Sequence, residues 1–397
     1  MIIHSNRIHT PEGIVSGYLN MEDGKIREIM TEKPEGAFKE YGDLHVIPGF
    51  IDLHVHGFST GSFWYEKTED SLNRMAKSMV QAGVTTFLGT TGTDAVDVIK
   101  ESLVEAKSAV KNWKPEMGSR ILGVHLEGPF INKEFKGMQR EEYCIDPDLE
   151  ITEELLRAAG EDNVYLMTLA PELHGAEEVI RYLHKKNVQI SIGHSAAEIE
   201  EIEALKGYGL GGVTHMYSGM RGFHHRRPGV VGAALYFDDL YCEFAKQTGM
   251  TVSHEAFSIA YRIKGKEKIM LCTDCTGLAH VERPFHHYIR KETYTPDGEY
   301  VIVRSDDGEE RRINKKNFDE VDGLELSYIE SVKNVQREHN LSFDEIITIA
   351  SVNPAKYISV YDKMGSLETE KYADLLVVED DFTIKDIYVQ GEHHRVR

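Results

Sequence analysis

The stretch FIDLHVH, residues 50–56, is the first of eight short apolar runs that alternate with charged stretches of helical spacing, such as residues 71–82 and 177–186. Repeated strand–helix units predict parallel strands joined by right-handed crossovers, and eight of them predict a (β/α)8 TIM barrel of the α/β class. An open, doubly wound sheet is the alternative. The predicted strands are Phe50–His56, Val84–Gly89, Ile121–Leu126, Val164–Leu169, Val188–Gly193, Gly212–Met216, Leu240–Ala245 and Lys268–Thr273.

Both ends of the chain have a different pattern, in which short apolar runs are separated by turn residues. Pro11-Glu12-Gly13 and Asp23-Gly24-Lys25 separate such runs near the start, and two more runs lie at 373–378 and 387–389. We therefore expect a small β-sandwich domain, built from residues 1–49 and 363–397, around a barrel formed by residues 50–362.

The composition of the chain restricts the classes of molecule that it can bind. The formal net charge is −21, so nucleic acid and anionic membranes would be repelled, whereas a small anionic substrate in a local basic pocket stays compatible. Four cysteines are too few for a disulfide framework, and no apolar run approaches the roughly 18 residues of a membrane span. The first residues also lack the apolar core of a signal peptide. We expect a cytoplasmic protein.

Residues able to bind a metal stand at the ends of the predicted strands. His54 and His56 close the first strand, and residues two apart on a strand point to the same face. Four more candidates end or follow other strands: Glu127, His194, His215 and Asp274. The carboxyl ends of barrel strands form one rim, so these side chains should converge there. Imidazoles and carboxylates suit a divalent Zn, Fe, Mn or Co ion, although any single histidine is more often a surface or core residue.

Several motifs carry a family resemblance. They are Pro48–Gly57, His125–Phe130, Thr168–Glu172, Gly193–Ser195, Thr214–Met216, Thr273-Asp274, Asn353–Ala355 and Met364–Leu367. In this order they resemble the N-acetylglucosamine-6-phosphate deacetylase family of the amidohydrolase superfamily, over nearly the whole chain. The fourth predicted strand contains no lysine, whereas many other amidohydrolases bridge two metals with a modified lysine there. This favours the deacetylase branch.

The resemblance implies roles for the rim residues. Glu127, His194 and His215 resemble the ligands of the ion that polarises the scissile carbonyl and holds the attacking water. His54 and His56 resemble ligands of a second ion, which Glu127 would bridge, so one or two divalent ions are expected. Asp274 resembles the general base that takes a proton from the water and returns it to the leaving amine.

The substrate-binding positions differ more from the family. Ser218 and Gly219 stand where the family has asparagine and alanine, and Thr251 replaces a histidine that helps to hold the sugar phosphate. Gln139 matches a position that binds sugar hydroxyls. Arg226 matches the phosphate-binding arginine, which in the family comes from the neighbouring subunit, so a homodimer is implied. The alternative for the basic loop around Arg226 is a solvated surface loop, and the unmatched segment 278–312 is expected to shape the pocket.

The sequence therefore predicts a metal-dependent deacetylase that acts on a small anionic sugar, with N-acetylglucosamine-6-phosphate as the leading substrate. Two alternatives remain. One is another amidohydrolase that acts on a different N-acyl or cyclic amide substrate, as Ser218 and Thr251 would allow. The other is a barrel that has kept its fold as a non-catalytic binding protein.

Overall fold

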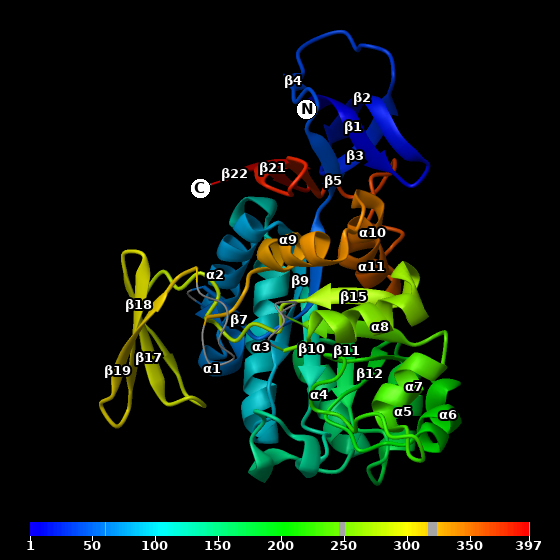
Figure 1. Ribbon diagram of the computed structural model, residues 1–397, viewed down its shortest axis with the longest axis vertical. Coiled ribbons are helices and arrows are strands. Elements are labelled where there is room, and N and C mark those ends of the chain that lie inside the picture. Colours follow the sequence, from blue (N-terminus) through cyan, green and yellow to red (C-terminus); the bar gives the residue numbers. More distant parts are fainter. Residues whose placement is uncertain (60, 246–250, 317–323, 397) are drawn as a thin grey trace.

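The computed structural model describes residues 1–59, 61–245, 251–316 and 324–396 (Figure 1). Eight parallel strands form one sheet in the order β15-β14-β13-β12-β11-β10-β9-β6. Their bounds are β6 (Phe50–Val55), β9 (Val84–Thr91), β10 (Arg120–Glu127), β11 (Val164–Leu169), β12 (Gln189–Ile192), β13 (Leu210–Val213), β14 (Tyr241–Ala245) and β15 (Ile269–Cys272). Every strand predicted in the sequence is present, and the predicted barrel is confirmed.

The barrel closes where the first and last strands meet. The buried Asp52 on β6 accepts hydrogen bonds from the hydroxyl of Thr273 (2.7 Å) and from its backbone N–H (3.3 Å). Just beyond β15, the N–H of Asp274 donates to the carbonyl of His54 at 2.8 Å, and the N–H of His56 donates to the carbonyl of Cys275 at the same distance. These contacts hold the end of β15 beside the two histidines of β6.

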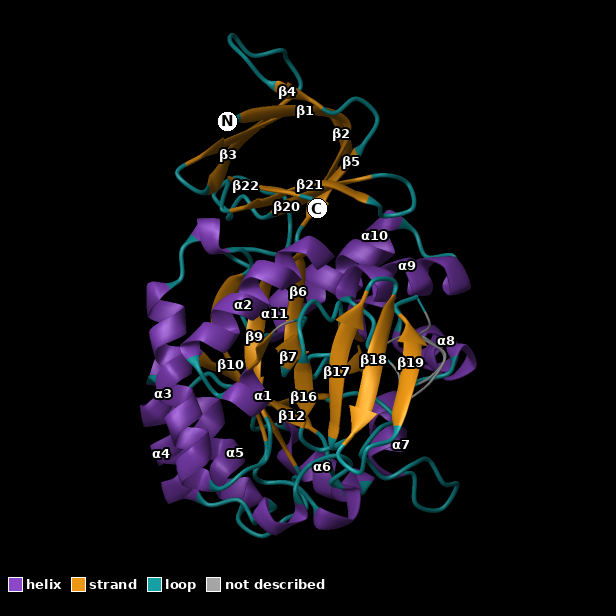
Figure 2. Cartoon of the chain, turned by 90° about the vertical axis from the view of Figure 1, so that its left-hand side faces the viewer, coloured by secondary structure: helices purple, strands orange, loops and turns teal. Residues whose placement is uncertain are grey.

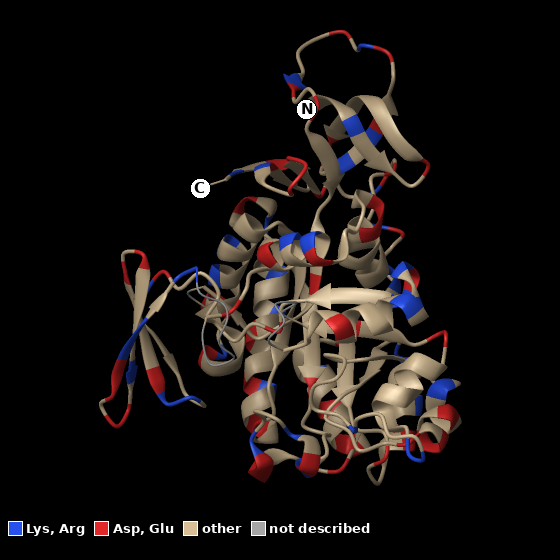
Figure 3. Cartoon of the chain, in the orientation of Figure 1, with Lys and Arg blue, Asp and Glu red and all other residues tan. Residues whose placement is uncertain are grey.

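Helices alternate with the barrel strands and pack their apolar faces against them. On α5, Val179 and Leu183 are buried, whereas Glu177 and Arg181 pair on the exposed face. Acidic and basic residues are interspersed along the outer helices (Figure 3). The helices are α1 (Phe63–Glu66), α2 (Glu69–Met79), α3 (Val96–Asn112), α4 (Leu149–Ala159), α5 (Ala176–Lys185), α6 (Ile199–Lys206), α7 (Gly229–Tyr236), α8 (His254–Lys264), α9 (Tyr328–His339), α10 (Phe343–Ile347) and α11 (Asn353–Tyr357).

Strands from both ends of the chain form a second sheet above the barrel (Figure 2). The two ends join where Ile47 on β5 pairs with Leu376 on β20, and residues such as Ile8, Leu19 and Val377 form its core. Its strands are β1 (Ile2–Thr10), β2 (Gly13–Glu22), β3 (Lys25–Met30), β4 (Lys39–Glu40), β5 (His45–Pro48), β20 (Leu375–Val378), β21 (Ile384–Val389) and β22 (Glu392–Arg395). The predicted sandwich from both termini is confirmed; the exact boundaries at residues 49 and 363 stay a prediction.

The unmatched segment contains a further antiparallel sheet, which lies in front of the barrel in Figure 2. Its strands are β16 (Phe285–His287), β17 (Glu292–Asp297), β18 (Tyr300–Ser305) and β19 (Glu310–Asn314). Phe285, Tyr294 and Val303 pack with Leu278 in a separate small core. All four cysteines of the chain are buried and free. Among the described residues, no helix combines the length and the apolar character that crossing a membrane requires.

Candidate metal centre and active site

The structure brings the six predicted rim residues together at the carboxyl ends of the barrel strands. Glu127 is the last residue of β10, and His194, His215 and Asp274 each lie two residues beyond the end of a strand. These last three have left-handed backbone conformations, with φ of 50°, 33° and 46°. The chain therefore turns sharply at each of them, which brings the side chains over the barrel mouth.

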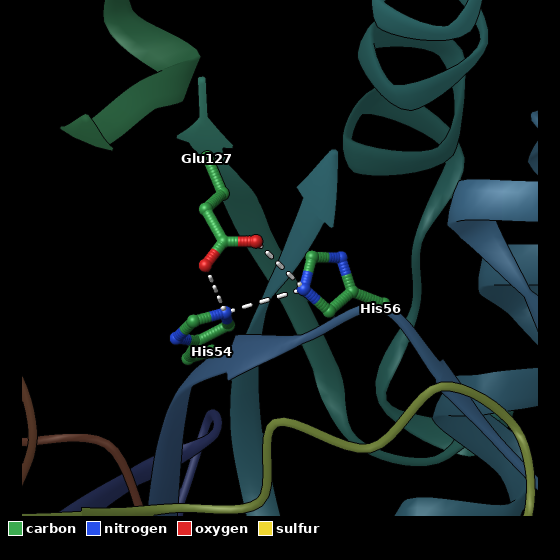
Figure 4. Close-up of side chains that lie close together, drawn as sticks. All are labelled: His54, His56 and Glu127. Carbon is green, nitrogen blue, oxygen red and sulfur yellow. Dashed lines mark hydrogen bonds and ion pairs between the residues drawn. The ribbon is translucent and has the colours of Figure 1, made fainter. Parts of the chain in front are cut away.

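Two groups of ligand atoms converge there. In the first, the Nε2 atoms of His54 and His56 lie 3.2 Å apart, and they lie 3.4 and 3.1 Å from oxygens of Glu127 (Figure 4). In the second, the Nε2 atoms of His194 and His215 lie 3.1 Å apart, at 3.2 and 3.1 Å from Oε1 of Glu127. Glu127 belongs to both groups, as a bridging ligand would.

The other ring nitrogen of each histidine faces a hydrogen-bond acceptor. The Nδ1 contacts are His56 to the carbonyl of Thr90 (3.2 Å), His194 to that of Phe135 (2.8 Å), His215 to that of Ser218 (3.0 Å), and His54 to the Glu243 carboxylate (2.9 Å). An acceptor at Nδ1 requires the proton there, so each neutral ring presents the Nε2 lone pair to the centre. Four such lone pairs and a carboxylate at this spacing repel one another unless a cation lies among them.

The spacing fits a divalent ion. A tetrahedral ion with bonds of about 2.0–2.1 Å holds neighbouring ligand atoms roughly 3.3–3.4 Å apart, and the contacts within the two groups span 3.1–3.4 Å. Mixed imidazole and carboxylate donors suit Zn, Fe, Mn or Co. The geometry thus fits the predicted cofactor class.

The local electrostatics also favour a cation. Burial disfavours the charge of Glu127, but the neighbouring His54, His194 and His215 outweigh it and hold the pKa of this carboxyl well below its usual value. Burial likewise opposes a charge on His54, yet the carboxylates of Glu243 and Glu127 raise the pKa of His54 well above its usual value. A buried imidazole that favours a proton lies in a strongly negative electrostatic potential. The same potential would attract a metal ion.

Asp274 lies where a proton acceptor would act. Its Oδ1 is 3.4 Å from Nε2 of His54 and 3.5 Å from Nε2 of His56, and 27% of its side chain remains exposed. Glu127, by contrast, is 2% exposed. Asp274 is therefore the rim carboxylate that combines proximity to the ligand atoms with access for a small molecule.

Comparison with known proteins agrees with this geometry. Residues 45–393 match the sequence model of the amidohydrolase family. The chain belongs to the amidohydrolase family. Among its relatives are the N-acetylglucosamine-6-phosphate deacetylase of Vibrio furnissii, 32% identical over 88% of this chain and 83% of the relative, and the N-acetylgalactosamine-6-phosphate deacetylase of Escherichia coli O157:H7, 30% identical over 98% of both. The resemblance seen in the motifs is confirmed.

The solved structures agree with the fold of this amidohydrolase. The crystal structure of the N-acetylglucosamine-6-phosphate deacetylase from Pasteurella multocida superimposes with a TM-score of 0.84 at 26% identity, over the full length of both chains. The corresponding enzyme from Thermotoga maritima gives a TM-score of 0.81 at 27% identity, again over both full chains. The barrel and the terminal sheet therefore have the arrangement seen in these enzymes.

Three of the predicted substrate-binding residues contact the predicted metal ligands of this amidohydrolase. The amide of Gln139 donates to Oε2 of Glu127 at 2.5 Å and accepts from the N–H of Thr93 at 2.7 Å. The backbone carbonyl of Ser218 accepts from His215, and Gly219 lies against the rings of both second-group histidines. Each therefore orients a ligand here, and their contacts with substrate stay a prediction.

Gly219 offers a direct check of this close packing. It has φ of +56°, and a Cβ at this position would lie 2.9 Å from Nδ1 of His194. Gly219→Ala should cost about 1–2 kcal/mol in backbone strain and displace that ring, which weakens ion binding by roughly 10-fold or more. Titration of the apo protein with Co²⁺ measures the loss. Gly222→Ala, where a Cβ meets nothing within 4 Å, is the control and should bind as the wild type does; equal affinity in both variants would contradict the proposed packing constraint.

The other two predicted substrate-binding residues lie farther out. Arg226 is exposed, and its backbone N–H donates to the ring of His224 at 3.3 Å. Thr251 is also exposed and donates its hydroxyl to the carbonyl of Ala245 at 2.9 Å. The three residues before Thr251 lie outside the described residues. Roles for Arg226 and Thr251 in substrate binding stay predictions.

A cavity of about 560 Å³ adjoins the metal centre. Gln139 and Trp64 form part of its wall; Gln139 contacts Glu127, and the ring of Trp64 lies 4.8 Å from that of His56. The unmatched segment contributes Tyr288, Ile289 and Lys291 to the same cavity. This supports the expectation that the segment shapes a pocket.

Sequence reasoning missed several buried polar residues around the ligands. Asp52 closes the barrel, and Glu243 contacts His54. His125 is buried between the carbonyl of Leu53 and the hydroxyl of Thr168, and burial lowers its pKa well below the usual value. Each of these side chains is charged or an imidazole and stands within an otherwise apolar strand. Such a side chain is costly to bury without a partner, so its position in the sequence could have indicated a buried polar contact.

Proposed function

We propose that this amidohydrolase is a metal-dependent deacetylase that hydrolyses the N-acetyl group of an amino-sugar phosphate, most simply N-acetylglucosamine-6-phosphate to glucosamine-6-phosphate and acetate. The observation that carries the proposal is the convergence of four Nε2 lone pairs and Glu127, with the accessible carboxylate of Asp274 beside them. Relatives over nearly the full length are deacetylases of the gluco and galacto isomers, so both sugars are candidates.

The chain's own residues account for the proton transfers. Asp274 accepts a proton from the attacking water, whose oxygen bonds to the acyl carbon. The C–N bond then breaks, and Asp274 returns the proton to the amine nitrogen, so acetate and the free amine leave. A divalent ion held by His54, His56, Glu127, His194 and His215, in one or two sites, supplies water activation and polarisation of the acyl oxygen.

The proposed phosphate contact involves Arg226. Its exposure suits an arginine that reaches the site of a neighbouring copy, so a homodimer belongs to the same proposal. Within Arg221–Gly229, Arg221 and Arg227 already contact Glu198 at 3.4 and 3.0 Å. No ion pair of Arg226 is found among the described residues, so its guanidinium remains available for an anion.

Arg226→Ala should therefore raise KM for the phosphorylated sugar and hardly change it for the unphosphorylated analogue. Removing a charge-assisted contact costs about 1.5–3 kcal/mol, roughly 10- to 150-fold in affinity. Steady-state kinetics on both substrates measure the difference. Arg181→Ala, an exposed arginine on α5, is the control. Equal changes for the two substrates would mean that Arg226 supports its loop instead of binding phosphate.

One assay separates this function from its alternatives. Acetate release by the metal-loaded protein is compared for N-acetylglucosamine-6-phosphate, its galacto isomer and N-acyl amino acids. Preference for an N-acyl amino acid would support the alternative in which this amidohydrolase acts on a different N-acyl substrate. A metal-loaded protein without turnover on any of them would support the non-catalytic binding protein. The cytoplasmic location predicted from the sequence stays a prediction.

A further inference from the structure

Glu243 is a buried carboxylate on β14 that contacts both halves of the candidate metal centre. Only 3% of the residue is exposed. Its Oε1 lies 2.9 Å from Nδ1 of His54, in the first ligand group, and accepts the backbone N–H of His215, in the second group, at 3.0 Å. Its own carbonyl accepts the N–H of Met216 at 2.7 Å. One side chain therefore holds a ring from β6 and the turn that follows β13.

The partner of His54 differs from those of the other three histidines. His56, His194 and His215 direct Nδ1 at neutral backbone carbonyls, whereas His54 directs Nδ1 at a carboxylate. A charge-assisted hydrogen bond is roughly twice as strong as a neutral one and makes the imidazole a better electron donor. Glu243 thus increases the donor strength of His54 in particular.

The backbone contact has a separate effect. His215 has φ of +33°, in the left-handed region that costs a non-glycine residue roughly 1–2 kcal/mol. Its N–H is tied to Glu243 and its Nδ1 to the carbonyl of Ser218, so both the turn and the ring are fixed. Loss of the Glu243 contact would release a turn on which the second ligand group depends.

We propose that Glu243 is a positioning residue of the metal centre, which orients His54 through its charge and fixes His215 through its backbone. The inference rests on the proposed metal-dependent function. Partners of this kind typically change metal affinity by about 10- to 100-fold. Glu243 is buried and contacts Nδ1 of His54 and the backbone N–H of His215, so its effect on the ion passes through the two histidines.

The alternative role for Glu243 is that of a direct metal ligand, and this role makes a different prediction. Ligand atoms of His54, Glu243 and Cys272 lie within 4.8 Å of one another and would form a third ligand group if Nδ1 of His54 bound an ion. In that case Cys272→Ser would weaken binding as much as a change at Glu243. With Glu243 as a positioning residue, Cys272→Ser should keep the wild-type affinity.

The test uses the full-length apo protein titrated with Co²⁺ in competition with a chromophoric chelator. Glu243→Gln keeps the shape and removes the charge, so the dissociation constant should rise about 10- to 100-fold and the visible absorption of bound Co²⁺ should shift. Glu325→Gln is the matched control: Glu325 is a buried glutamate that accepts from the N–H groups of Thr276 and Leu278. It should lose stability without a change in the Co²⁺ spectrum.

A wild-type dissociation constant and spectrum in Glu243→Gln would overturn the proposal, and so would equal effects in Glu325→Gln or Cys272→Ser. If Glu243→Gln does not fold, Glu243→Asp tests the same point, because it keeps the charge but withdraws it from His54. A wild-type protein that binds Co²⁺ without releasing acetate would refute the proposed function and leave the role of Glu243 standing. A wild-type protein that binds no ion would refute both.

Discussion

Replacing Asp274 by asparagine should lower turnover by about 10²–10⁴-fold while the protein keeps its bound ion. The side chain keeps its size, but an amide cannot accept the proton of the attacking water. The ligand set should stay in place, because the contacts between Glu127 and the histidines do not involve Asp274, and asparagine keeps an oxygen that can face His54 and His56 as Oδ1 of Asp274 does. Acetate release and metal content, measured on the same preparation, separate the proton-transfer step from ion binding.

The interpretation depends on the fold staying intact. The N–H of Asp274 donates to the carbonyl of His54, and asparagine keeps that backbone contact and tolerates the left-handed conformation at this position. The melting temperature should therefore stay close to that of the wild type. Turnover within tenfold of wild type, with the metal still bound, would exclude Asp274 as the general base.

The fold was predictable because its signal is local and repeated. Each barrel strand is a short, apolar run flanked by helical spacing, and β9 is buried along its whole length. The predicted strand that runs to Met216 was three residues too long, because β13 stops at Val213, two residues before His215, just as β12 stops two residues before His194. Alternation along a strand cannot reveal that the chain enters the left-handed region at these histidines. The proposed metal centre requires these turns, but the apolar alternation of the sequence does not predict them.

The supporting residues of the site were harder to predict, because they act over long separations in the sequence. Glu243 contacts His54 across 189 residues, and the amide of Gln139 contacts Glu127 rather than solvent. The sheet β16–β19 was also missed. Strands β17 and β19 are half exposed and lack a regular apolar pattern, so the alternation of β18 around Val301 and Val303 has no matching neighbour in the sequence. Residue types at strand ends indicate a metal site, but they do not show which backbone carbonyl or carboxylate orients each ligand.

Replacing Glu127 by glutamine should remove more metal than any single histidine substitution. Glu127 is the ligand common to both groups, and its negative charge offsets that of the ion. Removing one partner from a buried charged cluster costs about 3–5 kcal/mol, roughly 10²- to 10³-fold or more in affinity. The amide nitrogen would also face imidazole lone pairs in place of a cation. Metal analysis after dialysis against a weak chelator should find Glu127→Gln almost free of metal.

The histidine variants make this expectation specific. His56→Asn removes a ligand of the first group alone, and His194→Asn removes a ligand of the second group alone. If two ions bind, each of these variants should lose about one ion and keep the other, whereas Glu127→Gln should lose both. If one ion binds, only the histidine of the occupied group should matter, and the pair of variants identifies which group that is. With two ions, Glu127→Gln gives the largest loss; with one ion, it should lose at least as much metal as the more affected histidine variant, because Glu127 belongs to both groups. Wild-type stoichiometry in Glu127→Gln would show that the ion is held by the histidines and that Glu127 is not the central ligand.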